Sequence, residues 1–281
     1  MATPTFNASV DFFALASNAA LKLVSSNENR SIQTASGTNT FGDSAAVDSY
    51  GLSAAPSCEY EVIGTIQHTN AAPIFKLGDV VTTPGIVLSG DTASPLVIGT
   101  MTINTQSGSA PRITVNGQAV QASASAPLRT YVMPRFRLTA RHRAQDMIYG
   151  SSVSETLCTI KKGSSAADPQ VDYGLDSVNA TFPVEFSLAQ PKGELANYDI
   201  RGGTATVDYS MNWFADTPPT IEVMSSITVG SGQSTFTVVP VMTTPVGKSN
   251  PENGYTQYTW QVSFPLIGYE GAHTPIQTTS S

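Results

Sequence analysis

The sequence predicts an all-β protein that folds as an antiparallel β-sandwich. Three observations support this prediction: apolar and polar side chains alternate along many segments, residues that end strands separate these segments, and few segments have a helical pattern. The alternation is clearest in Thr204–Trp213 and Tyr258–Phe264, where aromatic and aliphatic side chains share one face of each expected strand. Roughly a dozen strands are expected, forming one sandwich or two packed β lobes.

Further strand candidates fill much of the chain, and most are bounded by Gly, Pro, Asn, Asp or Ser. They are Glu59–Gln67, Ile74–Val81, Gly85–Leu88, Leu96–Thr105, Thr130–Thr139, Pro183–Ala189, Ile221–Val229 and Thr235–Val241. The pair Asn116–Gly117 lies between β-forming residues and predicts a two-residue hairpin turn, because both residues tolerate the positive φ of a type I′ turn.

Two short segments have features of helices. One is Phe12–Val24, and the other is Ser154–Lys162, where Ser154 would be the N-cap and two lysines before Gly163 would complement the helix dipole. The segment Ser25–Ala54 is polar and rich in Asn, Ser, Thr and Gly, so we expect a long loop or arm there. The tail after Gly271 is expected to be flexible or ordered by a partner.

These elements divide the chain into three parts. Residues 1–54 form an N-terminal strand, arm and loop, residues 55–162 form a first β lobe with a basic strand, and residues 163–281 form a second lobe with the flexible tail. The boundary between the lobes is placed at Gly163–Pro169, a small and polar stretch. A single continuous domain is the alternative.

Charged residues make up only 12% of the chain, whereas Ser, Thr, Ala, Gly and Asn are abundant. Such a composition predicts a polar but largely uncharged surface. This surface suits strands with Thr and Ser on their outer face, and it also suits an interface, because desolvating a hydroxyl costs less than desolvating a charge. The net charge of −7 argues against general nucleic-acid binding, which requires a cationic surface.

Positive charge is concentrated in one part of the chain. Residues 112–162 contain eight of the 14 basic residues and two of the 21 acidic ones, a balance of +6 against −13 for the rest. On a strand, alternate side chains of this segment would place four arginines on one face: Arg135, Arg137, Arg141 and Arg143. Arginine suits paired hydrogen bonds to carboxylates. We predict a contact with the acidic face of a neighbouring copy, with nucleic-acid binding and a merely solvated face as alternatives.

No motif for catalysis or for a cofactor is found, so we expect a protein that is not an enzyme and has no bound metal. His68, His142 and His273 lack metal-ligand spacing, and there is neither a phosphate-binding glycine loop nor a Gly-x-Ser-x-Gly elbow. Two weaker candidates were weighed. Glu59 and Glu61 share a strand face, as paired catalytic carboxylates would. Asp168–Asp176 contains three aspartates and is either a surface calcium site or a solvated acidic loop.

The two cysteines, Cys58 and Cys158, are a hundred positions apart and define no redox or metal motif. Two free buried thiols are expected, and a disulfide is the alternative. The N-terminal residues contain no Lys or Arg before a short apolar run, so neither a signal peptide nor a membrane anchor is expected.

This combination of an uncharged Thr/Ser-rich β architecture, an N-terminal arm and charge-separated faces, with segments such as Ser57–Val62 and Pro95–Ile103, resembles bacteriophage virion structural proteins. The similarity is to tail-tube, head-decoration and connector components. It implies a virion protein, made in the host cytoplasm, whose partners are copies of itself and other virion proteins. No functional residues transfer from it. A tail tube is favoured, since a negative protein can line a conduit without gripping DNA.

Two alternatives to a tail protein stay open at this point. One is a capsid decoration or head protein. The other is a carbohydrate-binding or adhesin-like sandwich, which would need an exposed aromatic platform drawn from Trp213, Trp260, Tyr255 and Tyr258. Aromatic residues at strand period more often belong to a core.

Overall fold

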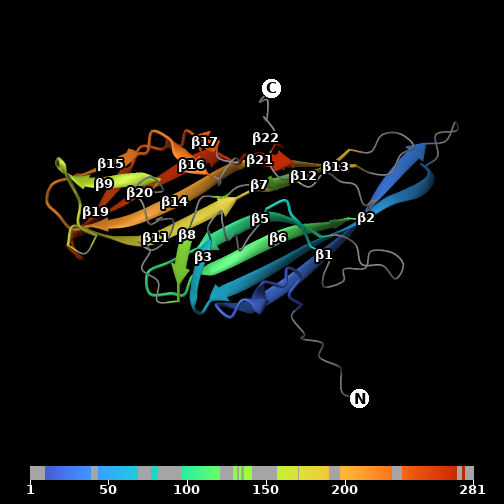
Figure 1. Ribbon diagram of the computed structural model, residues 1–281, viewed down its shortest axis with the longest axis horizontal. Helices are drawn as coiled ribbons and strands as arrows, with labels where there is room; N and C mark the ends of the chain where they lie inside the picture. The colour runs from blue at the N-terminus through green and yellow to red at the C-terminus, as the bar shows by residue number, and fades with distance from the viewer. Residues whose placement is uncertain are drawn as a thin grey trace, which may run out of the picture.

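The computed structural model describes residues 10–38, 44–68, 77–81, 96–120, 129–131, 133, 136–140, 157–169, 171–189, 197–229, 236–270 and 274–275. These residues form an all-β, sandwich-like fold of antiparallel strands, as predicted (Figure 1). One large sheet dominates, and several small sheets add their buried side chains to the same hydrophobic core.

The large sheet has ten strands, eight of them in the order β1-β2-β6-β5-β11-β14-β20-β18, with β19 also paired to β20 and β4 to β5. Their bounds are β1 (Leu21–Thr38), β2 (Ser44–Val62), β4 (Val80–Val81), β5 (Leu96–Asn104), β6 (Arg112–Val120), β11 (Tyr173–Phe182), β14 (Thr204–Trp213), β18 (Val241–Met242), β19 (Val246–Asn250) and β20 (Tyr255–Pro265). The strands β5 and β11 lie on opposite sides of the expected lobe boundary and pair directly, with Ala180 beside Ile103.

The small sheets contain two or three strands each. They are β10-β9-β15, β12-β13, β16-β17, β22-β21-β7 and β3-β8. Their bounds are β3 (Thr65–His68), β7 (Arg129–Tyr131), β8 (Phe136–Thr139), β9 (Cys158–Lys162), β10 (Ser165–Ala166), β12 (Val184–Ala189), β13 (Asn197–Gly202), β15 (Pro219–Val223), β16 (Ile227–Val229), β17 (Phe236–Val238), β21 (Gly268–Glu270) and β22 (Thr274–Pro275).

The alternation of buried and exposed residues along the strands shows which side chains form the core. In β14, five residues from Ala205 to Trp213 are buried at every second position, and the residues between them are exposed or half-buried. Trp260, Val262 and Phe264 of β20 continue the same buried face. The strands expected at 204–213 and 258–264 are therefore confirmed, and their period-two pattern marks the face that the core covers.

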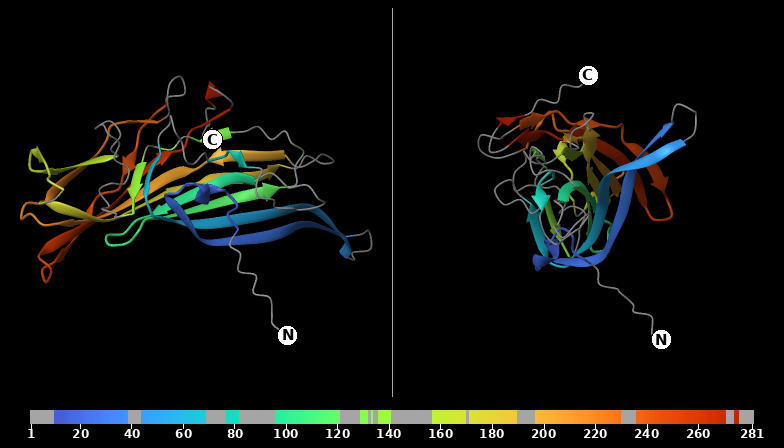
Figure 2. Two further views of the ribbon diagram at one scale, coloured as in Figure 1. Left: turned by 60° about the horizontal axis from the view of Figure 1, so that its bottom comes forward. Right: turned by 90° about the vertical axis from the view of Figure 1, so that its right-hand side faces the viewer.

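The large sheet is staggered, so that different strands project at its two ends. Pairing of β2 with β6 ends at Ser53 and Val120, but pairing of β2 with β1 continues to Ser44 and Thr38. We call this extension, Ile32–Thr38 with Ser44–Leu52, the β1–β2 arm. At about 3.3 Å per residue it reaches roughly 30 Å beyond the last residue of β6. Figures 1 and 2 show the arm in blue, projecting from the body on the side away from β9, β15 and β19.

Of the two alternatives expected for Ser25–Ala54, a long loop or an arm, the loop is wrong, because most of this segment is paired strand and part of it forms the β1–β2 arm. The segment lacks apolar alternation where it forms the arm, since a ribbon outside the body has no core to face.

The two helices expected from the sequence are wrong as well. Leu15–Ser17 is a single 3₁₀ turn before β1, and β9 takes the place of the second helix, with Cys158 and Ile160 buried at period two. The lysines precede a turn at Gly163, whose φ is 60°.

The hairpin turn expected at Asn116–Gly117 is also wrong, since β6 runs straight through both residues. Gly117 is required here for space. A Cβ atom at this position would lie 2.8 Å from a Phe13 ring carbon, 2.8 Å from the Val97 carbonyl oxygen and 2.9 Å from Leu96 Cδ1. Close approach of neighbouring chain segments, rather than a positive φ, explains this glycine.

The remaining strand candidates are matched with shifted bounds. Leu96–Thr105 and Pro183–Ala189 correspond to β5 and β12, while Glu59–Gln67 is divided into the end of β2 and β3. Three more candidates correspond to short strands: β7 and β8 at Thr130–Thr139, β15 and β16 at Ile221–Val229, β17 and β18 at Thr235–Val241. Of Ile74–Val81, β4 is described as a strand, and Gly85–Leu88 lies outside the described residues. So does most of the tail, apart from β22.

Candidate functional site: an assembly surface

Polar contacts join three strands of the large sheet at the end of β6 that lies away from the arm. Arg112 of β6 forms a 2.8 Å ion pair with Glu59 of β2, and the Ser25 hydroxyl of β1 donates to the other oxygen of Glu59 at 3.3 Å. The Glu59 carboxylate raises the pKa of Arg112. Glu59 therefore bridges β1 and β6, rather than forming a carboxylate pair with Glu61 within β2.

The outer face of the large sheet is polar, and its charged residues include Glu59, Arg112 and Asp208. The register aligns one cross-strand row on this face that contains four threonines and a serine: Thr114, Thr102, Thr181, Thr206 and Ser263. All five side chains are half-buried by their neighbours. Hydroxyl groups of this kind are desolvated at low cost, which makes the face suitable for contact with another protein surface.

A β-bulge in β11 interrupts this face. The register shifts between Leu175 and Ser177, so that the neighbouring residues Asp176 and Ser177 are both half-buried. The turn after β5 is fastened to the bulge. The Thr105 hydroxyl donates to the Val178 carbonyl at 2.7 Å and accepts from its N–H at 3.1 Å, and the Ser107 N–H donates to the Asp176 carbonyl at 2.7 Å.

Two hollows adjoin at this bulge, and both are lined by Ser177. The first has a volume of about 430 Å³, and its lining includes Gln106, Ser109, Arg112, Asp176 and Asn179. The second has a volume of about 470 Å³ and a mixed lining: polar residues such as Asp208, Ser210 and Gln261, and the apolar or aromatic residues Tyr209, Val246 and Trp260. The two hollows thus share one residue, Ser177; polar groups line the first, and polar and apolar groups together line the second. Sequence reasoning missed this feature because a bulge leaves no local signal in the alternation of residues.

Both edges of the large sheet carry residues that disfavour pairing with another strand. On β1, the ion pair between Glu28 and Arg30 at 2.6 Å accompanies three register shifts. Near β18 and β19, three exposed valines are flanked by Pro240 and Pro245, which lack the N–H that strand pairing needs. The arm and the outer face are therefore better suited to contact another copy than the sheet edges are.

Of the four arginines predicted at a subunit contact, the structure describes Arg137. It lies on β8 with its side chain exposed, while its neighbours Phe136 and Leu138 are buried. This alternation is the one that the sequence predicted. Arg135, Arg141 and Arg143 lie outside the described residues, as does His142.

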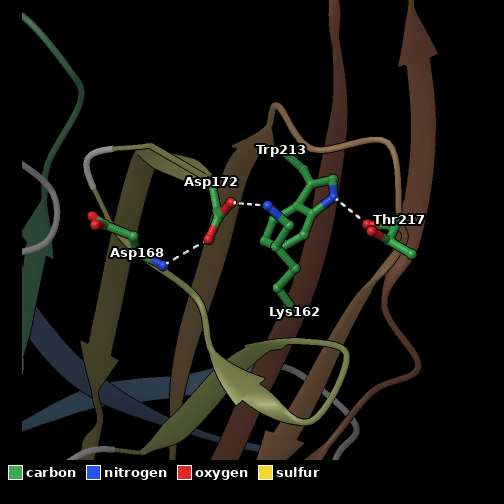
Figure 3. A network of polar contacts seen from close by, with 5 residues as sticks. All are labelled: Lys162, Asp168, Asp172, Trp213 and Thr217. Carbon is green, nitrogen blue, oxygen red and sulfur yellow. Dashed lines mark hydrogen bonds and ion pairs between the residues drawn. The ribbon is translucent and has the colours of Figure 1, made fainter.

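The acidic loop is organised by an ion pair (Figure 3). Lys162 Nζ donates to one Asp172 oxygen at 2.6 Å, and the Asp168 N–H donates to the other at 3.0 Å. Lys162 and the Asp168 N–H hold the pKa of Asp172 below its usual value. In the same region, the indole N–H of Trp213 donates to the Thr217 carbonyl at 2.7 Å. Within the described residues no cluster of three or more His, Cys, Asp or Glu side chains is arranged to hold a metal ion.

The candidate aromatic platform is divided between core and surface. Trp213 and Trp260 are 2% and 4% exposed, and Trp260 stacks on Tyr209 with ring centroids 5.0 Å apart. Tyr255 and Tyr258 are half-buried, and Tyr255 meets Phe214 edge to face. Neither tryptophan is accessible to a sugar ring in this arrangement.

Both cysteines are buried, and no disulfide joins them. Burial raises the pKa of both thiols, that of Cys158 to about 11, where the polar atoms of Trp260 and Tyr209 offset part of the effect. The thiol of Cys58 donates to the Val10 carbonyl at 3.6 Å, beneath an N-terminal segment that Asp11 fastens. The Asp11 carboxylate accepts from the Tyr60 hydroxyl and from the Ala16 N–H.

No protein-family model matches the chain, and no curated protein matches it. In the part of the chain that the structure describes, no helix has the length and apolar character needed to cross a membrane.

Proposed function

We propose that this chain is a non-enzymatic structural protein of a virus particle that assembles with copies of itself through the β1–β2 arm. A phage tail tube or a related tail component is the role that we favour. The observation that carries the proposal is the arm itself. Its strands pair with each other beyond Ser53 and Val120, and no third strand supports them among the described residues.

An isolated two-stranded ribbon is at best marginally stable in water. A ribbon that extends roughly 30 Å from the body adds little to the stability of the protein unless another surface covers it. Its described residues contain a single charged side chain, Asp48, so covering the ribbon desolvates few charges. These properties support a role for the arm in contacts between subunits.

The outer face of the sheet and the exposed Arg137 support the same proposal. The threonine row is polar without charge, and Arg137 projects from a body whose charge is negative outside residues 112–162. We propose that Arg137, with Arg135, Arg141 and Arg143, meets acidic surface on a neighbouring copy. A carbohydrate-binding role is less well supported, because the two tryptophans that would best stack on a sugar are in the core.

The test is negative-stain microscopy of the purified protein beside a variant with a shortened arm. In the variant an Asn-Gly turn replaces residues 32–52 and joins Ser31 to Ser53, which remain paired at the base. We expect rings or tubes from the full chain and single particles from the variant. The variant should keep a cooperative thermal transition, because Ala54 and the rest of the core are unchanged.

A point variant, Arg137→Glu, tests the second contact. We expect it to weaken assembly, whereas Lys248→Glu on β19, an exposed strand of the large sheet, should leave assembly intact. A full-length protein that stays monomeric at every soluble concentration, or a shortened variant that assembles normally, would rule out the proposed role of the arm.

A further inference from the structure

The arm and the two hollows at the β11 bulge lie in opposite halves of the molecule. The arm extends past the end of β6 at Val120, whereas the first hollow lies where β6 begins at Arg112, next to the first half of β11. Figures 1 and 2 show the arm projecting away from the body. An arm in this position faces away from the hollows of its own chain, so the surface that covers it belongs to another copy.

We propose that the two adjoining hollows at the β11 bulge receive the β1–β2 arm of a neighbouring copy. This inference rests on the proposed function and names the surface that the arm contacts. The occupant is a second copy of this chain, bound through the ribbon Ile32–Thr38 and Ser44–Leu52.

The chemistry of the two surfaces agrees. The lining includes the hydroxyl and amide groups of Gln106, Ser177, Asn179 and Ser210, which provide both donors and acceptors, beside the apolar surface of Val246 and Trp260. The arm is rich in serine and threonine and carries one described charge. Hydrogen bonds between such surfaces replace those to water. Two of the charged groups in the hollows already have partners in the chain, because Arg112 pairs with Glu59 and Asp208 accepts from the Gln261 amide at 2.8 Å.

The bulge supports the choice of this surface. A bulge aims side chains differently from a regular strand, and here the fold fastens it with the Thr105 and Ser107 hydrogen bonds. The hollows are thus a fixed feature of the sheet rather than a gap between loosely packed side chains. The sheet edges offer a poorer surface, because Pro240, Pro245 and the Glu28–Arg30 pair protect them.

The contact is heterologous, since an arm at one end meets a hollow in the other half of the next copy. Heterologous contacts produce rings when the rotation closes and filaments when it does not. Assemblies of this protein should therefore be closed rings or filaments, rather than two-fold symmetric dimers.

Cross-linking between two kinds of chain tests the inference. One chain carries Thr34→Cys in the middle of the arm, and the other carries Ser177→Cys, where the two hollows meet. The control chain carries Asn116→Cys, an exposed position on β6 outside both hollows. The native thiols Cys58 and Cys158 are buried and do not compete. Assembled mixtures are treated with a short bismaleimide, and products are read by denaturing electrophoresis.

We expect a covalent dimer from the Thr34→Cys and Ser177→Cys mixture, and a yield at least tenfold lower with Asn116→Cys. A second pair of variants needs no cross-linker: Ser177→Arg should abolish assembly, while Asn116→Arg should not. Assembled particles that cross-link equally at both positions, or that tolerate Ser177→Arg, would overturn the inference while leaving arm-dependent assembly in place. Failure of the unmodified chain to assemble would instead overturn the proposed function.

Discussion

Lowering the pH should destabilise this protein through His68, a residue of the small sheet that carries Arg137. His68 is 2% exposed and stacks on Phe136, with ring centroids 4.9 Å apart and an angle of 4° between the rings. Burial lowers the pKa of His68 from 6.5 to about 4. The unfolded chain therefore binds a proton more readily than the folded chain does, and stability is lost as the pH falls from about 6.5 toward 4.

The size of the effect follows from the shift in pKa. Each unit corresponds to about 1.4 kcal/mol, so the full shift is worth about 3 kcal/mol, of which about 2 kcal/mol is already lost at pH 5. The assay is urea unfolding of the wild type and of a His68→Phe variant between pH 7 and pH 4. The other groups titrate alike in the wild type and the variant. The difference between their free energies of unfolding therefore reports the contribution of His68 protonation alone.

The wild type should lose about 2 kcal/mol relative to the variant between pH 7 and pH 5. A difference that stays constant over this range would show that the imidazole is accessible to water. It would then refute the burial of His68 and Phe136, and with it the exposed orientation of Arg137 on the other side of β8.

Other buried and exposed positions give further predictions. Gly117→Ala should cost about 1–3 kcal/mol in urea unfolding, because its methyl group would overlap Phe13, Leu96 and the Val97 carbonyl. Asn116→Thr should change stability by no more than about 0.5 kcal/mol, since it is exposed in a strand; a large loss there would instead indicate a turn. Trp213→Phe should cost about 1–3 kcal/mol in the same assay, because the Thr217 carbonyl loses its donor; an unchanged midpoint would contradict that hydrogen bond. A thiol reagent at pH 8 should leave native Cys58 and Cys158 unmodified and should titrate both after unfolding, and rapid labelling of the native protein would contradict their burial.

The sequence predicted the fold class and the long core strands, because apolar residues at every second position report burial on one face directly. Thr204–Trp213 matches β14 residue for residue. The same rule predicted which face of β8 is exposed at Arg137. Burial on one side of a sheet is a local property, and a local pattern is enough to reveal it.

The errors arose where neighbours distant in the sequence decide the conformation. Gly117 accommodates Phe13 and Val97, which are 104 and 20 positions away in the chain, so the Asn-Gly pair alone suggested a turn. Ser154–Lys162 had a helical cap and helical charges, but β15 pairs with Cys158–Lys162 and supplies the partner strand. The sequence did not predict a paired ribbon at the arm. The two strands of the arm pair with each other outside the core, so their residues show no alternation of apolar and polar side chains.

The candidate site was predicted in part. Its polar composition and the exposed Arg137 followed from the sequence, whereas the hollows depend on a bulge in β11 and on the turn after β5. These two segments are about 70 positions apart and meet through Thr105, Val178 and Asn179. Nothing local to either segment indicates that they meet.

Hydrogen exchange in the arm tests the account most directly. Amide exchange is measured by mass spectrometry in dilute protein and in assembled protein, and peptides from the arm are compared with peptides from β14. We predict that amides in Ile32–Thr38 and Ser44–Leu52 exchange much more slowly after assembly, because a neighbouring copy covers them, while those of β14 keep the same slow exchange. Assembled protein whose arm exchanges as fast as it does in the dilute protein would contradict the claim that the arm joins the subunits.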